Sequence, residues 1–446
     1  MLKSKGLVFF YFFISVLGLM ICAFWNGYPI LYADTSTYLN SAFEVETPVD
    51  RPIMYGLFIR LTSFNFLSLW TVIGFQVLLF VHEVYQLFKN LFRKEPGPVF
   101  FIGLVLLGGL SSLSWTASQL MPDIFTSILL LSLLNMIWSD KGRARYWHYF
   151  VFLISVACHL SHISFSLGLI VFLVLIRLLF RRTLGDLIPI KILLHAVLLT
   201  FLALLSMGKA LSNSKHVFLA GAMAERGVLQ AVLEDKCSGE QVPYQLCTYQ
   251  EEIPSIGWQF VWEKDSPLYK IGGWKASKKE LNQIIKQSLL EPKYLWLHVI
   301  STLSSTIKQL STIKVGDGNG RFDHASLLSQ RLKAYVPHEY ASFVQSKQNL
   351  EGVESMSTYI RIHYIILLAC LGVLMYRLSH FKGIDIKLQL IITTFVLSII
   401  WNAFLAAAFA NVIDRLGSKM IFLIPLVVLF TFFKEGPIEK GHTQKI

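Results

Sequence analysis

Ten apolar segments separated by polar connections constrain the fold of this chain more than any other feature. A helix that crosses a bilayer needs about 20 mostly apolar residues. Only 15% of the residues are charged, and the mean hydropathy is +0.55. We therefore expect an all-α polytopic membrane protein with about ten transmembrane helices. The segments lie near residues 7–25, 65–88, 98–115, 123–138, 147–160, 164–180, 188–207, 358–376, 387–409 and 419–433.

The basic residues indicate how the chain is oriented. Residues 208–357 carry 17 Lys and Arg against 15 Asp and Glu, so the excess of positive charge lies elsewhere. Cytoplasmic loops are enriched in Lys and Arg. Basic residues lie in every second connection between the apolar segments, which predicts an even number of spans with both termini in the cytoplasm. The net charge of +12 therefore requires no nucleic-acid partner. Basic residues occupy alternate connections: Lys3/Lys5, Lys89/Arg93/Lys94, Lys141/Arg143/Arg145, Arg177/Arg181/Arg182/Lys191, Arg377/Lys382/Lys387 and Lys434/Lys440/Lys445.

This topology divides the chain into four parts. Residues 1–207 are expected to form a membrane domain with seven spans, whose first outer loop is 26–64. Residues 208–357 are expected to form one mainly helical, extracytoplasmic soluble domain inserted before the last three helices. Residues 358–433 then supply three spans, and 434–446 form a cytoplasmic tail.

The extracytoplasmic part carries three local signals. Cys237 and Cys247 are expected to form a disulfide, because an oxidising compartment favours one. Ser277 and Glu280 have the spacing of a capping box, which predicts that a helix begins there. After Pro292, the stretch "YLWLHVISTLSSTIKQL" is apolar enough to lie against the membrane or to pack on it.

Polar residues of candidate function gather at the outer ends of the spans. No phosphate-binding loop or dinucleotide fingerprint occurs in the sequence, so we expect any chemistry at the outer face or within the membrane. A lipid phosphate carries its charge at this depth; Arg and Lys bind phosphate, and a carboxylate accepts a proton from an attacking hydroxyl. The candidates are Asp34, Tyr38 and Arg51 in the first loop, Asp123 at the fourth span, His159 and His162 between the fifth and sixth, and Arg415 and Lys419 before the last.

Several of these residues also have a simpler structural explanation. Asp123 suits the N-terminus of a helix, where unpaired amides favour a carboxylate. His159 and His162 share a helix face, where they could bind a metal but are more often a hydrogen-bonded pair. Arg415 and Lys419 suit an anchor at the lipid headgroups. Asp34 has the weakest explanation of this kind, since no opposite charge is closer in sequence than Arg51.

Four stretches resemble membrane glycosyltransferases of the C-type fold (GT-C), which use polyprenyl-phosphate sugars. "ADTSTYL" is similar to their first outer loop, with Asp34 at the catalytic acid and Tyr38 at the tyrosine that often follows. "RPIMYGLFIRLTS" is similar to the amphipathic part of that loop, "MPDIFTSILLL" to the second acid-bearing stretch, and "DRLGSKMIFLIPLVVLF" to the late turn that carries an arginine. In layout, the resemblance covers residues 1–207 and 358–433.

The resemblance implies an inverting transfer of a sugar from a polyprenyl-phosphate donor to a lipid, glycan or protein acceptor of the cell envelope. Asp34 is then the general base, Asp123 assists it, and Tyr38, Arg51, His159, His162, Arg415 and Lys419 bind substrate. Many relatives have a second acid after the first, whereas Thr35 follows Asp34 here, and Leu416 follows Arg415 where a tyrosine is common. Use of a divalent metal ion is therefore left open.

Three other functions remain open from the sequence. A carrier or flippase for a lipid-linked precursor would place charges midway along several spans. An outer-leaflet acyltransferase would use His159 or His162 as base, with Ser161 or Ser164 as the nearby hydroxyl. A non-catalytic assembly factor would not depend on Asp34. The short loops and the lack of organelle signals favour a bacterial inner membrane, with the large domain in the periplasm and membrane lipids around the spans.

Overall fold

The fold is helical throughout the part of the chain that the structure, a computed structural model, describes. These residues are 2–140, 142–238, 243–352, 356–380 and 383–433, so the predicted tail 434–446 lies outside them. Within these ranges no strand forms, and the all-α prediction is confirmed. A single parallel bridge joins Ile30 and Gln119 in the same ranges.

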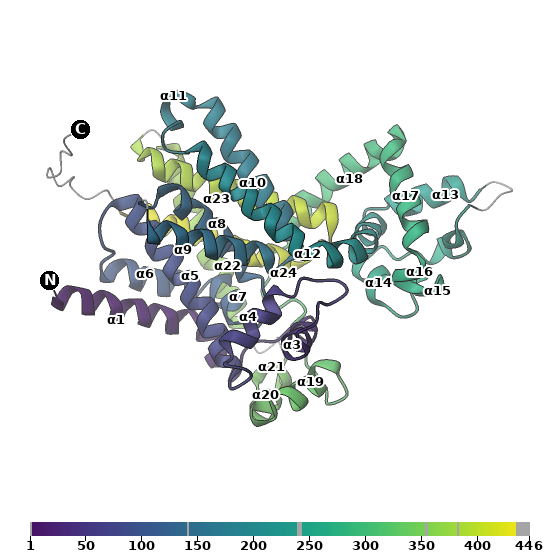
Figure 1. Cartoon of the computed structure of the whole chain (residues 1–446), viewed down its shortest axis with the longest axis horizontal. Helices are drawn as coiled ribbons and strands as arrows, with labels where there is room; N and C mark the ends of the chain where they lie inside the picture. The colour runs from purple at the N-terminus through teal and green to yellow at the C-terminus, as the bar shows by residue number, and fades with distance from the viewer. Residues whose placement is uncertain (1, 141, 239–242, 353–355, 381–382, 434–446) are drawn as a thin grey trace.

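The described residues up to Glu225 form twelve α-helices (Figure 1). They are α1 (Leu2–Leu19), α2 (Ile21–Asn26), α3 (Thr35–Glu44), α4 (Met54–Thr62), α5 (Leu69–Phe92), α6 (Pro98–Gly109), α7 (Ser112–Ser118), α8 (Ile124–Trp138), α9 (Arg143–Ala157), α10 (Leu160–Leu179), α11 (Arg181–Leu184) and α12 (Ile190–Glu225).

In the described residues, two groups of helices follow before the last four. The first group is α13 (Val228–Lys236), η1 (Gln245–Glu252), α14 (Gly257–Trp262), α15 (Pro267–Lys270), α16 (Gly273–Ala276), α17 (Lys278–Leu290) and α18 (Pro292–Ser311). The second is α19 (Leu327–Tyr335), η2 (Pro337–Glu339), α20 (Tyr340–Val344) and α21 (Lys347–Leu350). The last is α22 (Ser357–Ser379), α23 (Ile386–Phe409), α24 (Asp414–Ile421) and α25 (Leu423–Phe430).

Five of the described helices are long and apolar enough to cross a membrane: α5, α10, α12, α22 and α23. The pair α6 and α7 would count as a sixth span, but the two helices meet at an angle of 80°. Gly6–Leu19 of α1 and the helix α8 are apolar but shorter. These helices are compatible with a multi-pass membrane protein. Every one of the ten predicted segments contains helix, although the count of ten spans stays a prediction.

The predicted first outer loop, residues 26–64, contains two short helices, α3 and α4. Gly56 allows them to approach closely, since a Cβ at this position would lie 2.1 Å from the Ser41 hydroxyl oxygen. Helix α19 packs against α3, and the ring of Tyr335 stacks on that of Phe43 with centroids 4.0 Å apart. Glu339 fixes the segment α19–α21 to the start of α5, because its carboxylate accepts hydrogen bonds from the Ser68 hydroxyl and the Leu69 amide.

The described part of residues 208–357 contributes mainly to two cores, and Val315 and Met356 belong to a third, smaller one. One consists of buried residues between Val217 and Tyr294, contributed by the end of α12 and by α13–α18. The other is the main core, which α19 and α20 join through Leu328, Leu332 and Phe343. In Figure 1, the helices α13–α17 lie at the opposite end of the molecule from the start of α1, whereas α19–α21 lie beside α3. The single extracytoplasmic domain stays a prediction.

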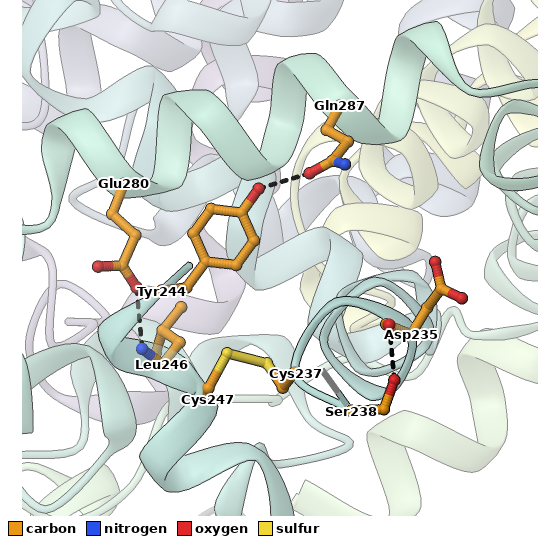
Figure 2. Close-up of a disulfide and its surroundings, with 8 residues drawn as sticks. All are labelled: Asp235, Cys237, Ser238, Tyr244, Leu246, Cys247, Glu280 and Gln287. Atoms are coloured by element: carbon orange, nitrogen blue, oxygen red, sulfur yellow. Dashed lines mark hydrogen bonds between the residues drawn. A yellow bond between two sulfur atoms is a disulfide. The ribbon is translucent and has the colours of Figure 1, made fainter. Parts of the chain in front are cut away.

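A disulfide closes the link between α13 and η1, as the two cysteines predict (Figure 2). The Cα atoms of Cys237 and Cys247 lie 5.5 Å apart. Glu280 also supports this link, because its carboxylate accepts the Leu246 amide at 2.9 Å. The predicted capping box is therefore wrong in its contacts: α17 begins at Lys278 as expected, but the Ser277 side chain makes no capping hydrogen bond and Glu280 satisfies an amide of another segment.

Candidate functional site

Asp34 lies where the first outer loop enters α3. It occupies the N-cap position but makes no side-chain capping bond, so its carboxylate is free for other partners. One oxygen, Oδ1, lies 3.4 Å from Nη2 of Arg51, and the other, Oδ2, lies 3.2 Å from Nη1 of Arg415. The structure thus brings together a carboxylate and two guanidinium groups from distant parts of the chain.

Arg51 is fixed by several contacts within the same loop. Its Nε donates to Oδ2 of Asp50 at 2.9 Å, and its Nη1 donates to the Asp34 carbonyl oxygen at 3.4 Å. The guanidinium carbon also lies 5.1 Å from the centre of the Tyr38 ring, a cation–π distance. Tyr38 is buried one helical turn after Asp34, so its ring shapes the wall of the site.

Asp123 holds a second pair of cations. Its carboxylate lies 3.5 Å from Nζ of Lys419 and 3.7 Å from Nε of Arg415. Arg415 and Lys419 are four residues apart on α24, so they share one face of that helix. Asp123 makes no side-chain capping bond to α8, and its side chain is only 3% exposed. The simple helix-cap explanation of this acid is therefore not what the contacts support.

Two residues that the sequence did not single out complete the surroundings of Arg415. The Tyr32 ring centre lies 4.2 Å from its guanidinium carbon, and Asp317 accepts the Arg415 backbone amide at 3.3 Å. Gly318 lies so close to Tyr32 that a Cβ there would be 1.9 Å from a ring carbon, and its φ of +71° also favours glycine. The loop after α18, which carries Asp317 and Gly318, thus packs against the site.

Buried hydrogen bonds join the two segments that precede Asp34 and Asp123. The Ile30 amide donates to the Ser118 carbonyl at 2.9 Å, and the Leu120 amide donates to the Ile30 carbonyl at 2.9 Å. Asn319 connects both segments, because its amide nitrogen donates to Leu31 and its oxygen accepts from Gln119. The segments that lead to Asp34 and Asp123 are consequently held side by side.

The opposite charges of the site nearly balance, and one of its acids, Asp34, is partly exposed to solvent. Burial disfavours the charged form of Asp34, but Arg51 and Arg415 outweigh it and hold the pKa of this carboxyl below its usual 3.8. The Asp34 side chain is 30% exposed. Among the buried side-chain atoms described, Oδ2 of Asp123 and Nε of Arg415 have no hydrogen-bond partner. These two atoms lie 3.7 Å apart, so Asp123 and Arg415 form an ion pair that is too long for a hydrogen bond.

His159 and His162 lie on one side of the site, and each makes hydrogen bonds with residues close to it. His162 is buried, and both ring nitrogens are used: Nδ1 donates to the Ser155 carbonyl at 2.6 Å, and Nε2 lies 2.9 Å from the Thr126 hydroxyl. A direct contact of His162 with substrate would break one of these bonds.

His159 caps α10 with Nδ1, which accepts both the amide (3.2 Å) and the hydroxyl (2.8 Å) of Ser161. Burial, together with His162 and Lys419, lowers the pKa of His159 well below its usual 6.5, so the ring is neutral and Nε2 carries the proton. The cap uses the Ser161 amide, whereas the Ser161 hydroxyl is within hydrogen-bond distance of the same ring nitrogen, so the acyltransferase alternative stays open.

The described residues contain no group of three or more His, Cys, Asp or Glu side chains arranged to hold a metal ion. The arrangement instead resembles a phosphate site, because guanidinium and ammonium groups converge beside an ionised carboxylate. Comparisons with protein-family models, with curated proteins and with solved structures found no match to the chain.

Proposed function

We propose that this protein is an integral membrane glycosyltransferase that moves a sugar from a polyprenyl-phosphate donor to an envelope acceptor. The observation that carries the proposal is the contact of both Asp34 oxygens with Arg51 and Arg415, next to the Asp123–Lys419 pair. These groups provide a base and several phosphate-binding cations at one place. The likeness to the C-type fold, which rests on the short stretches around the same residues, supports the same reading.

In the proposed step, the acceptor oxygen attacks the anomeric carbon of the sugar. The bond between that carbon and the phosphate oxygen breaks, and the lipid phosphate leaves with the electron pair. The acceptor proton passes to Asp34, and inversion at the anomeric carbon follows from the single displacement. Arg51, Arg415 and Lys419 stabilise the charge that the phosphate gains, and Asp123 positions the last two.

The low pKa of Asp34 fits this step only if the donor changes the surroundings of the carboxylate. A phosphate oxygen that binds the two guanidinium groups would replace Asp34 as their partner. Asp34 would then lose the charges that lower its pKa and become a stronger base. Donor binding would thus prepare the base for the acceptor.

The proposed surroundings follow the predicted topology. The site faces the periplasm of a bacterial inner membrane, both termini are cytoplasmic, and membrane lipids surround the spans. Residues 208–357 help to select the acceptor, and α19 packs against α3 of the first outer loop. Tyr38 and His159 contribute to the substrate pocket, and His162 holds α8, α9 and α10 in place behind it.

The test is transfer of radiolabelled sugar from polyprenyl-phosphate donors in membranes with matched protein levels. Asp34→Asn should lower the rate about a hundredfold or more, which is the range of a lost general base. Asp323→Asn, which changes an exposed acid in the loop that follows α18, should keep the wild-type rate. If Asp34→Asn transfers sugar as fast as wild type, the assignment of the base is wrong.

A carrier for a lipid-linked precursor is the second candidate, and one buried cluster favours it. Glu83 on α5 is fully buried, and its Oε2 contacts Nδ1 of His148 at 2.8 Å and Nδ2 of Asn135 at 2.7 Å. Ionisable groups within a membrane often mark a transport path. If Glu83→Gln stops appearance of the precursor in the outer leaflet while Asp34→Asn does not, the carrier replaces the transferase, provided that Glu83→Gln keeps the wild-type unfolding temperature.

A further inference from the structure

The helix α18 has its polar side buried and an apolar side exposed. The residues turned inward follow helical spacing and are Tyr294, His298, Thr302, Thr306 and Gln309. A second side exposes between 43% and 71% of each large apolar residue. These residues are Leu295, Trp296, Val299, Ile300, Leu303 and Ile307, and they are called the α18 apolar face below.

Protein groups satisfy the inward side, which fixes the rotation of the helix. Nη1 of Arg226 donates to the Thr302 hydroxyl at 2.7 Å and to the carbonyl oxygen of Ala407, at the end of α23, at 3.0 Å. Gln309 exchanges two hydrogen bonds of 3.1 Å with the backbone of Ile413. Turning the α18 apolar face inward would break these bonds and bury unpaired polar groups.

The neighbouring helix α17 shows the opposite arrangement. Over most of its length it buries Leu281 and Ile284 and exposes Asn282, Gln283 and Lys286, as a helix in contact with water does; exposed Leu289 and Leu290 come only at its end, next to α18. The two helices are consecutive, yet the exposed side of α17 suits water and the exposed side of α18 suits an apolar medium. Monomeric soluble proteins rarely expose such a continuous apolar face.

The position of α18 indicates which apolar medium covers it. The helix packs against α23, one of the helices that can cross a membrane. Its C-terminal end is next to α24, since a Cβ at Gly417 would lie 2.1 Å from the Thr312 carbonyl oxygen. Leu416 in turn accepts a hydrogen bond from Asn402, within α23, at 2.6 Å. The end of α18 is therefore level with the outer part of a span. Figure 1 shows that α18 connects the helices α13–α17 to the main bundle.

We propose that α18 lies in the outer leaflet of the membrane, with the α18 apolar face against lipid acyl chains. Leu303 and Ile307, near α24, lie deepest, and Trp296 lies toward the headgroups, where tryptophan is favoured. The apolar face continues the lipid-facing surface of the spans, on which α23 exposes Ile400. The polar residues Ser304 and Lys308 leave the helix on another side. This inference does not depend on the proposed function.

The sequence alone left this point open for a physical reason. Thr302, Ser304, Ser305, Thr306, Lys308 and Gln309 lower the hydropathy of the stretch below that of a span. Three of them, Thr302, Thr306 and Gln309, face protein, and only the structure separates them from the residues that face outward. The predicted soluble domain would then contain one helix that contacts the membrane.

The test places an environment-sensitive fluorophore on single cysteines of the full chain in phosphatidylcholine and phosphatidylglycerol vesicles. Leu303→Cys and Ile307→Cys report on the α18 apolar face, and Lys308→Cys on the adjacent polar side. Lys279→Cys on α17 is the water control, and Leu198→Cys on α12 is the lipid control, since each residue is exposed. The native free cysteines Cys22, Cys158 and Cys370 are buried and give little background.

Lipids that carry a nitroxide on the acyl chain should quench positions 303 and 307 as strongly as position 198. They should leave positions 279 and 308 nearly unquenched. Quenching at 303 and 307 no stronger than at 279 would overturn the proposal, as would equal quenching at 307 and 308, which would remove the distinction between the two sides. Each labelled protein is first matched to wild type in its unfolding temperature, so that a misfolded variant does not enter the comparison.

Discussion

Asp34 and Arg415 are 381 positions apart in the chain, yet Nη1 of Arg415 donates to Oδ2 of Asp34 at 3.2 Å. Arg415 also lies 3.7 Å from Oδ2 of Asp123, so a single guanidinium group connects the acids at the starts of α3 and α8. A ligand that binds Arg415 must therefore affect both acids. The contacts of Arg415 and the loop that carries Gly318 lead to four testable predictions.

If Asp34 competes with the donor phosphate for Arg51 and Arg415, its removal should strengthen anion binding. We expect Asp34→Asn to bind a polyprenyl phosphate without sugar about fivefold more tightly, since partly exposed ion pairs contribute about 1 kcal/mol together. Isothermal titration in detergent measures this affinity. Asp323→Asn should bind as wild type does. Weaker binding by Asp34→Asn would contradict the competition, and no binding by wild type would contradict the proposed function itself.

Arg415→Lys tests whether the fork of the guanidinium group matters beyond its charge. An ammonium group cannot reach Asp34 and Asp123 together in the same geometry. We expect kcat for sugar transfer to fall about a hundredfold, the effect of losing one preorganised donor to a developing charge, and KM for the donor to rise. Steady-state kinetics with a labelled donor give both values. Arg321→Lys, at an exposed arginine of the adjacent loop, should leave both unchanged.

The pKa of Asp34 predicts how pH affects stability. This pKa is lower in the folded than in the unfolded chain, so the unfolded chain binds the proton more readily. The stability that Asp34 contributes is complete above the unfolded pKa of 3.8 and is lost as pH falls through the folded value. Thermal unfolding should therefore show the largest difference in Tm between wild type and Asp34→Asn near neutral pH. A difference that stays constant down to about pH 3 would argue against an ionised, paired Asp34.

Gly318→Ala should disturb the site without touching a charge. The new Cβ would meet the Tyr32 ring, and the φ of +71° costs a residue other than glycine about 1–2 kcal/mol. We expect a lower unfolding temperature and about a tenfold loss of transfer, because Tyr32 supports Arg415. Gly320→Ala is the matched control two residues on, since no atom lies within 4 Å of a Cβ there. Equal behaviour of the two variants would remove the loop from the site.

The sequence predicted the all-helical class and the disulfide because both depend on local information. Long apolar runs form helices in lipid whatever their neighbours are. The charge pattern also predicted that Asp34, Arg51, Asp123, Arg415 and Lys419 emerge at one face, and the structure does place these five side chains together. Their shared location had a physical signal, namely opposite charges at the outer ends of apolar segments.

Other parts of the site had no such signal. Topology determines the face of the membrane at which a residue emerges, but it does not determine which helices are neighbours. Tyr32 and Asp317 were therefore missed, since an aromatic residue after a span and an acid in a glycine-rich turn are common. His162 could not be separated from His159 by spacing, although one has both nitrogens occupied and the other caps a helix. Glu83 was missed because one acid in a long apolar helix hardly changes its hydropathy.

The parallel bridge between Ile30 and Gln119 has a consequence for changes in chain length. Asp34 and Asp123 each come four residues after a bridged residue, so the pairing acts as a common starting point from which both acids are measured. An insertion or deletion of one residue after either starting point would displace one acid by about 3.3 Å relative to the other. Arg415 could then no longer reach both. We therefore expect the two tripeptides 31–33 and 120–122 to tolerate substitution but not a change of length.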